Sequence, residues 1–225
     1  MQSTSTRSPE ECSQLTEKTT TSDTCNIEVP EGWGKTHVPG VHCNSDNETV
    51  DIMLIGEAPG ASEDELGRPF VGKAGQLLQQ TLVRISVTKN LYITNVIKYR
   101  PPNNRKPTQL EMIEMGQELC REILELKPKV IVCLVSSPAE YMMYLGETTK
   151  KGSLRGHSFP IHEYSYSVKE QQVEPIWSSR VLCTWHPSFI LRRRDKMPEL
   201  EHDLLLAKEW SSNDLAQQGP HGGAA

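Results

Sequence analysis

The sequence predicts an α/β protein in which a parallel sheet carries helices on its faces. Short, β-branched apolar runs alternate with segments of helical period, and Gly or Pro commonly bounds the runs. One run, residues 129–134, is apolar almost throughout, which is typical of a parallel strand buried on both faces. With 225 residues the chain is long enough for one such core, and a second full domain is not expected.

Strands are predicted where short apolar runs end in turn residues, and helices where apolar residues recur every three or four positions. Thr108 and Glu111 have the spacing of a capping box, which predicts the start of the longest helix. The predicted order is strand 51–55, helix 73–85, strand 91–97, helix 108–126, strand 129–134, helix 139–145, strand 181–185 and helix 199–210. Residues 153–180 have no clear period and fit either a hairpin or a long loop.

Both ends of the chain are predicted to be disordered tails, at 1–30 and 212–225, around one domain at 31–211. Eleven of the first 23 residues are Ser or Thr, and the whole chain is only 36% hydrophobic. Segments of this composition bury too little apolar surface to offset the entropy of ordering them. Neither end has an apolar run long enough for a signal peptide or a membrane span.

Cysteine usage and charge limit the compartment and the partners. The six cysteines form no C-x-x-C pair, which favours a reducing, intracellular location: cytoplasm or nucleoid, or the nucleus of a eukaryote. The net charge of −5 argues against nucleic-acid binding through overall charge. Any contact with DNA phosphates must therefore come from local basic clusters.

Three segments that follow predicted strands hold the unusual polar residues, and ligands bind at this edge of a parallel sheet. Residues 56–75 contain five glycines, which let the backbone approach a ligand closely; an ordinary glycine-rich loop is the alternative. Asn95 ends a strand, where its amide can pair with a base edge or simply cap a turn. His186 precedes a proline and is either functional or a structural histidine.

Together these segments resemble the fourth family of uracil-DNA glycosylases, an iron–sulfur family, over about residues 38–210. The matching stretches are Ile55-Gly-Glu-Ala-Pro-Gly60, Glu63-Asp64, Gly67-Arg-Pro-Phe-Val-Gly72, Ala74-Gly75, Ile93-Thr-Asn-Val96, Lys98-Tyr-Arg-Pro-Pro102 and His186-Pro-Ser188. Several independent motifs in the same order make the resemblance specific. It implies a three-layer α/β/α sandwich around a four-stranded parallel sheet. It also implies an enzyme that flips uracil, or a 5-substituted uracil, out of DNA and hydrolyses its N-glycosidic bond, which initiates base excision.

The resemblance also implies roles for individual residues. Phe70 is expected to stack on the flipped base beside Gly56, Asn95 to bond its polar edge, and His186 to donate to uracil O2. Glu63 is expected to position water and Glu57 to shape the pocket. These roles suit the chemistry, because uracil leaves as an anion and a fixed donor near O2 lowers the barrier.

Local positive charge is expected to hold the DNA. Lys98, Arg100 and Arg105 lie in a nine-residue stretch without an acidic residue, and Arg192 begins a run of three arginines after the His186 segment. Their position beside the pocket segments favours phosphate contacts over an ordinary solvated surface. Ser188 is expected to contact DNA from the minor-groove side.

The chain departs from this family at its [4Fe–4S] cluster, which four cysteines hold. Tyr99 and Met115 stand at two of the ligand positions, and Cys25 stands alone near the N-terminus. Cys120 lies five residues beyond the helix position and is predicted to face the core. Thiolates hold such clusters, so no cluster, other metal or cofactor is expected.

Three functional hypotheses therefore remain. The first is a monomeric uracil-DNA glycosylase without membrane contact; the second is a glycosylase specialised for another modified base. The third is a catalytically idle relative that binds DNA or a partner protein. The presence of Glu57, Phe70, Asn95 and His186 together argues against idleness. A related cross-linking subfamily has Gln at the position of Glu57, so covalent capture of DNA is not expected.

Overall fold

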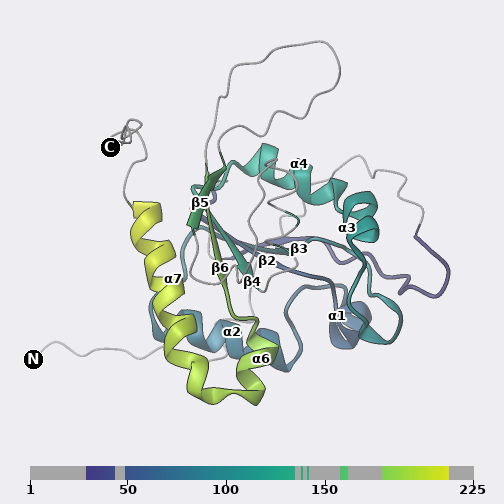
Figure 1. Ribbon diagram of the computed structural model, residues 1–225, viewed down its shortest axis with the longest axis horizontal. Helices are drawn as coiled ribbons and strands as arrows, with labels where there is room; N and C mark the ends of the chain where they lie inside the picture. The colour runs from purple at the N-terminus through teal and green to yellow at the C-terminus, as the bar shows by residue number, and fades with distance from the viewer. Residues whose placement is uncertain are drawn as a thin grey trace, which may run out of the picture.

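A mixed six-stranded sheet lies at the centre of the fold (Figure 1). The computed structural model describes residues 29–43, 49–134, 138, 141, 158–161 and 179–212, with only the backbone of 158–161. The strands are β1 (Val41–Cys43), β2 (Ile52–Gly56), β3 (Leu91–Asn95), β4 (Val130–Leu134), β5 (Ser158–Ile161) and β6 (Ser179–Thr184). Their order across the sheet is β1-β3-β2-β4-β6-β5.

The four central strands, β3, β2, β4 and β6, run parallel, and an antiparallel strand flanks them at each edge. The α/β class is confirmed, and the four predicted strands form with ends shifted by at most two residues. The expected four-stranded parallel sheet forms the centre, and the two antiparallel edge strands that extend it to six were not predicted. Strand β1 is too short for its pattern to be read from sequence, and β5 lies inside the stretch without a period.

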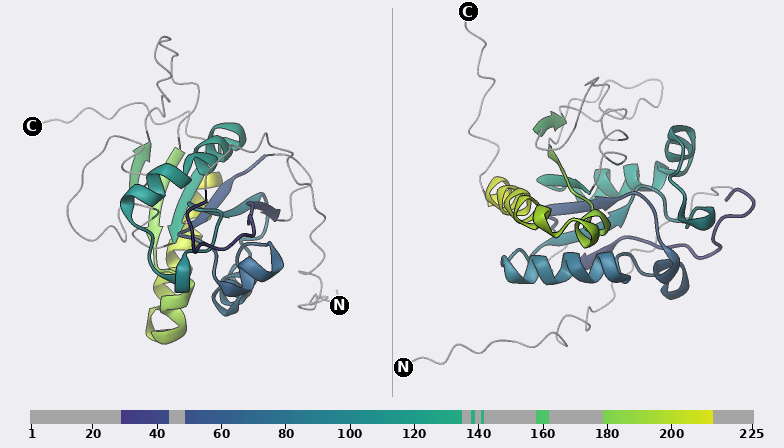
Figure 2. Two further views of the ribbon diagram at one scale, coloured as in Figure 1. Left: turned by 90° about the vertical axis from the view of Figure 1, so that its right-hand side faces the viewer. Right: turned by 60° about the horizontal axis from the view of Figure 1, so that its bottom comes forward.

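Helices cover both faces of the sheet, as the two views in Figure 2 show. The helices are α1 (Ala61–Leu66), α2 (Lys73–Arg84), α3 (Gln109–Met115), α4 (Gln117–Leu126), α6 (Pro187–Arg192) and α7 (Met197–Ser212), with 3-10 turns η2 (Pro102–Asn104) and η3 (Arg194–Lys196). Met53 of β2 packs in one core cluster with residues of α3 and α4, and Leu54 packs in the other with residues of α2, α6 and α7. Alternate strand residues thus fill opposite cores.

The helix predicted at 108–126 is two helices, because the chain kinks at Gly116. Its predicted start is confirmed: the Thr108 hydroxyl accepts from the Glu111 N–H at 3.2 Å, and the Glu111 carboxylate accepts from the Thr108 N–H at 2.7 Å. A Cβ at position 116 would lie 2.4 Å from the Met112 carbonyl oxygen and 2.5 Å from the Tyr141 hydroxyl. Only glycine fits this close approach.

Several predictions fall wholly or partly outside the described residues. Pro138 and Tyr141 are helical, and the rest of the helix predicted at 139–145 lies outside them, as do nearly all residues of both predicted tails. None of the helices in the described part of the chain combines the length and the apolar character of a membrane span.

Candidate active site

A cavity of about 520 Å³ opens where β2, β3 and β6 end. Its walls come from the segments that follow these strands and from the loops around Phe70 and Asn104. The structure brings these predicted site residues together around it: Glu57, Glu63, Phe70, Asn95, Arg105, His186, Ser188 and Arg192. Residues far apart in sequence meet here because the carboxyl ends of parallel strands share one edge of the sheet.

Phe70 presents an aromatic ring to the cavity from a constrained turn. Its φ is 55°, in the left-handed region, and 6% of the residue is exposed. Gly75 lies against this turn so closely that a Cβ there would be 1.8 Å from the Phe70 carbonyl oxygen. Gly56 is not itself a lining residue; a Cβ there would lie 2.3 Å from Asn95 Oδ1 and 2.7 Å from Phe70 Cζ. Gly56 therefore permits the approach of two lining side chains.

Asn95, the last residue of β3, places an uncharged amide in the cavity wall and is only 3% exposed. The two residues after Asn95 remain hydrogen-bonded to the segment at the end of β2. The Val96 N–H donates to the Gly56 carbonyl at 2.9 Å, and the Ile97 N–H donates to the Glu57 carbonyl at 3.2 Å. The backbone segments that carry Asn95 and Glu57 are thus fixed relative to each other, and a fixed amide can read a ligand by its pattern of donors and acceptors.

His186 caps the N-terminus of α6 and has a defined tautomer. Its Nδ1 accepts from the Ser188 backbone N–H at 3.1 Å, and the Ser188 hydroxyl lies 2.8 Å from the same nitrogen. Because Nδ1 is an acceptor, the neutral ring carries its proton on Nε2. The pKa of His186 is lowered to about 4, chiefly by burial and secondly by the charge of Arg192, while the charge of Glu63 opposes the shift. At neutral pH the ring is therefore an uncharged Nε2–H donor.

Glu63 is engaged by the backbone on both sides of the cavity loop. Its Oε2 accepts from the Gly60 N–H at 3.1 Å, which begins α1, and its Oε1 accepts from the Gly72 N–H at 2.8 Å, just before α2. The side chain thus ties the two ends of the turn that carries Phe70. Both carboxylate oxygens of Glu63 already have a backbone partner.

Arg105 and Arg192 place positive charge at the cavity. Arg105 bonds the Glu111 carboxylate, at 2.8 Å for one pair of atoms, and its guanidinium lies 5.4 Å from the centre of the Trp33 ring. Arg192 is exposed and has no ion-pair partner among the described residues. Both are placed to contact an anionic ligand.

Lys98 and Arg100, two further predicted phosphate contacts, do not line the cavity. Arg100 is part-buried and donates to Asn104 Oδ1 at 2.7 Å, with Asp64 3.9 Å away. The prediction that Lys98 contacts a phosphate is wrong. The Lys98 residue is only 1% exposed, and its ammonium group pairs inside the fold with Glu122 at 2.7 Å. A basic stretch in the sequence does not show which of its cations turns inward.

Trp185 is a lining residue to which sequence reasoning assigned no role. Its ring stacks on that of Phe189 with centroids 4.6 Å apart and planes 20° apart, and Phe189 also lines the cavity. The Trp185 Nε1–H donates to Glu199 Oε2 at 2.8 Å, which anchors the pair to α7. The available signal was an aromatic residue directly before His186, at the end of a predicted strand.

The positions that would hold an iron–sulfur cluster do not fit one where the structure describes them. Met115 is 3% exposed within the core under α3 and α4, and half-buried Tyr99 packs against that core. The Tyr99 ring lies 5.5 Å from the ring of His37. Neither residue offers a thiolate, and Cys25 lies outside the described residues.

The described cysteines lie in the core rather than at a ligand site. All four are buried: Cys43, Cys120, Cys133 and Cys183. Cys120 faces the core as predicted, with its sulfur 3.2 Å from the Tyr141 hydroxyl. Within the described ranges, no group of three or more His, Cys, Asp or Glu side chains is arranged to hold a metal ion.

Comparison with known proteins agrees with this site. The model of the Uracil DNA glycosylase superfamily matches residues 44–208. A type-4 uracil-DNA glycosylase of Archaeoglobus fulgidus is 38% identical over 170 residues, which cover 74% of this chain and 78% of the relative. The corresponding values are 41%, 70% and 76% for a type-4 enzyme of Pyrobaculum aerophilum, and 33%, 80% and 88% for one of Thermotoga maritima. The chain therefore belongs to the type-4 family of the uracil-DNA glycosylase superfamily.

Proposed function

We propose that this protein removes uracil from DNA by flipping the base into the cavity and hydrolysing its N-glycosidic bond. The observation that carries the proposal is that Phe70, Asn95 and the Nε2–H of His186 meet in one cavity. A base inside a duplex is out of reach of such a pocket, so it must be extruded, and the Phe70 ring recovers part of the lost stacking. The relatives bear the name of this activity.

His186 stabilises the departing base. As the N-glycosidic bond breaks, its electron pair moves into the uracil ring and negative charge develops on O2. A neutral Nε2–H aimed at O2 stabilises this charge without transferring a full proton. The tautomer that the Ser188 contacts impose supplies this donor, and the lowered pKa keeps it uncharged at neutral pH.

We assign the positioning of the attacking water to Glu57, whereas the expectation from sequence was Glu63. Both oxygens of Glu63 accept backbone N–H groups, so Glu63 holds the Phe70 turn in place. Glu57 lines the same cavity at the end of β2. Its carboxylate orients water and offsets the positive charge that develops on the sugar as the bond breaks.

Substitutions of Glu57 and Glu63 are therefore expected to have different effects on rate and stability. Glu57→Gln should lower the single-turnover rate of uracil release by about 10²-fold, within the usual range for a positioned acid–base group. Glu63→Ala should lower the free energy of unfolding by about 1–2 kcal/mol, because it leaves two backbone N–H groups without acceptors. Denaturant titrations and single-turnover assays on both variants separate the effects, with exposed Glu65→Ala as the control. An unfolding loss in Glu57→Gln without a rate loss contradicts the assignment.

DNA is gripped by residues around the mouth of the cavity. Arg192 and Arg105 carry charge that can pair with phosphates, and Ser188 and Phe189 line the adjoining wall. Because the net charge of the chain is −5, these contacts must be local, and binding should weaken as salt rises. All the described residues around this cavity belong to one chain, and we propose that the enzyme acts as an intracellular monomer.

The enzyme works without an iron–sulfur cluster, because Tyr99 and Met115 take two ligand positions and offer no thiolate. The purified protein is expected to be colourless and to keep its fold and activity after dialysis against an iron chelator. Absorbance spectra with iron and sulfide analysis measure this. Absorbance near 400 nm that scales with bound iron and sulfide contradicts it.

A cleavage assay tests the proposed function. Single- and double-stranded oligonucleotides that contain one uracil are incubated with the protein, and alkali then breaks the strand at abasic sites. Strand breaks at uracil alone, with free uracil released, support the proposal. Breaks at another modified base but not at uracil indicate the specialised glycosylase, and binding without release indicates an idle relative.

A further inference from the structure

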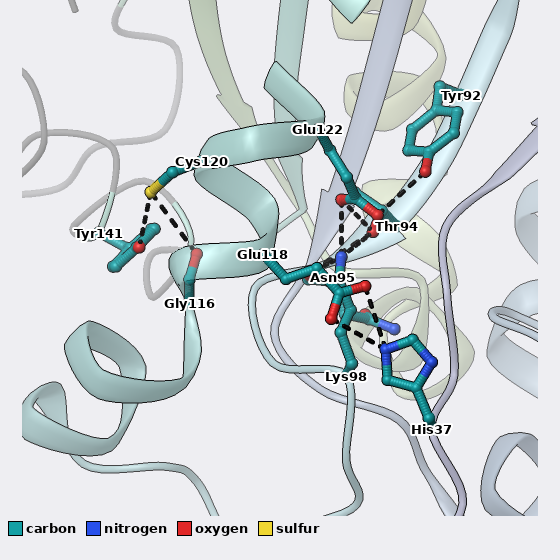
Figure 3. A network of polar contacts seen from close by, with 10 residues as sticks. All are labelled: His37, Tyr92, Thr94, Asn95, Lys98, Gly116, Glu118, Cys120, Glu122 and Tyr141. Atoms are coloured by element: carbon teal, nitrogen blue, oxygen red, sulfur yellow. Dashed lines mark hydrogen bonds and ion pairs between the residues drawn. The ribbon is translucent and has the colours of Figure 1, made fainter. Parts of the chain in front are cut away.

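The buried ammonium group of Lys98 is hydrogen-bonded to the backbone of Asn95, the residue whose side-chain amide is proposed to bind the base. Lys98 Nζ donates to the backbone carbonyl of Asn95 at 2.9 Å, to Glu122 Oε2 at 2.7 Å and to the Thr94 hydroxyl (Figure 3). An ammonium group has three N–H donors, and each has an acceptor here. Apolar residues can often replace such a buried pair without loss of stability, so stability alone does not account for it.

Glu122 of α4 also accepts hydrogen bonds from the hydroxyl groups of Tyr92 and Thr94. The Tyr92 hydroxyl donates to Oε1 at 2.9 Å, and the Thr94 hydroxyl lies 3.0 Å from Oε2. Burial, and after it the Glu122 carboxylate, raise the pKa of Tyr92, so its hydroxyl stays protonated and remains a donor. We call Tyr92, Thr94, Lys98 and Glu122 the Lys98 network.

The Lys98 network holds the end of β3 from the side opposite the cavity. The side-chain amide of Asn95 lies in the cavity wall. The backbone carbonyl of the same residue accepts from Lys98 on the α4 side. The residues on either side of Asn95 are bonded too: the Thr94 side-chain hydroxyl to Glu122, and the Val96 backbone N–H to the Gly56 carbonyl. A base-reading amide on the last residue of a strand needs such an anchor, because the sheet ladder ends there.

We propose that Lys98 and Glu122 are positioning residues that fix Asn95 for base recognition. The proposal rests on the proposed function and adds to it a specificity element outside the cavity. Neither residue touches the base; Lys98 acts through the Asn95 carbonyl and Glu122 through Lys98. A displacement of about 1 Å at a reacting or reading group is enough to cost about 10²-fold in rate.

The decisive variant removes both charges together. Lys98→Met alone strands the Glu122 carboxylate inside the fold, whereas Lys98→Met with Glu122→Leu leaves no buried charge unpaired and is expected to fold. In this double variant the single-turnover rate of uracil release should fall by about 10–100-fold, and uracil-over-cytosine discrimination should fall with it. In an Asn95→Ala background the same double change should have almost no further effect, since the group being positioned is gone.

Two further variants keep the test decisive. Glu122→Gln preserves the shape and one acceptor for Lys98, and it should show a smaller loss of rate that also disappears in the Asn95→Ala background. Glu118→Gln is the matched control, because Glu118 is one turn away on α4 and bonds His37 at 2.9 Å instead of Lys98 or Asn95. Its rate should equal that of the wild type.

The outcomes separate this inference from the proposed function. A wild-type protein that releases no uracil overturns the proposed function and the inference with it. If the wild type is active, a double variant with an undiminished rate overturns the inference alone. So does a loss of rate that is equally large in the Asn95→Ala background, because that loss acts through the fold in general rather than through Asn95.

Discussion

Replacing His186 with Ala is expected to lower the single-turnover rate of uracil release by about 10²–10³, the usual contribution of one fixed donor to a developing anion. Affinity for DNA with a non-cleavable uracil analogue should change little, because the donor acts mainly once negative charge has formed on O2. Single-turnover kinetics and equilibrium binding measure the two effects separately. Weakened binding with an unchanged rate assigns His186 to DNA contact instead.

The pH dependence of His186 supplies an independent check. The unfolded chain binds a proton at this ring near pH 6.5, whereas burial delays protonation of the folded protein until about pH 4. The folded state therefore loses stability as pH falls through this window, by up to about 3 kcal/mol from this group. Activity should be flat from neutral pH down to about 5 and should fall near 4, where protonation of Nδ1 breaks the Ser188 contact.

His186→Ala should lack this part of the stability change. The difference in unfolding free energy between the wild type and the variant should shift against the wild type between pH 6.5 and pH 4. A difference that does not vary with pH means that His186 titrates alike in both states, which contradicts a buried neutral donor.

Asn95→Ala is expected to reduce uracil release by about 10²-fold or more, because it leaves both hydrogen-bonding groups of the base edge without partners in the cavity. In the proposed function the side-chain N–H₂ of Asn95 donates to O4, and its side-chain carbonyl accepts from N3–H. Cytosine reverses this pattern, with a donor at N4 and an acceptor at N3, so we expect the wild-type site to reject it. Rates on matched uracil and cytosine oligonucleotides measure the discrimination.

Asn95→Asp sharpens this test, because it removes the donor and supplies an acceptor for cytosine N4–H₂ at nearly the same volume. This variant should lose most uracil release and gain a trace of cytosine release. The assignment of Asn95 fails if Asn95→Ala and Asn95→Asp both release uracil at the wild-type rate. Loss of uracil release without any cytosine release still supports base reading, since Glu57 and His186 remain set for uracil.

Much of the site could be predicted because its motifs follow strands. Phe70, Asn95 and His186 lie far apart in the sequence, yet the α/β pattern placed the segments that carry them at one edge of a parallel sheet. Apolar runs such as 129–134 identified the strands well, since strands buried on both faces carry no competing polar signal. Periodicity and the alternation of strands with helices were therefore enough to predict the edge of the sheet at which the cavity lies.

The remaining features depend on contacts that no local pattern encodes. The basic stretch around Lys98 predicts an exposed cation. Its burial depends on the ion pair with Glu122 of α4, which the sequence pattern does not indicate. Glu63 lines the cavity, but its hydrogen bonds to the Gly60 and Gly72 N–H groups could not be predicted from the sequence. Tertiary hydrogen bonds of this kind decide whether a charged group faces a ligand or holds the loop that carries one.

The structure of the protein bound to DNA tests most directly whether uracil is flipped into the cavity. Duplex DNA with 2′-fluoro-2′-deoxyuridine is suitable, because the fluorine destabilises the oxocarbenium-like transition state and slows cleavage. We expect an extrahelical uracil on the Phe70 ring, with O2 within hydrogen-bond distance of His186 Nε2 and the O4 and N3 edge against the Asn95 amide. A uracil that stays stacked in the duplex, or one bound with a different edge toward Asn95, contradicts this expectation.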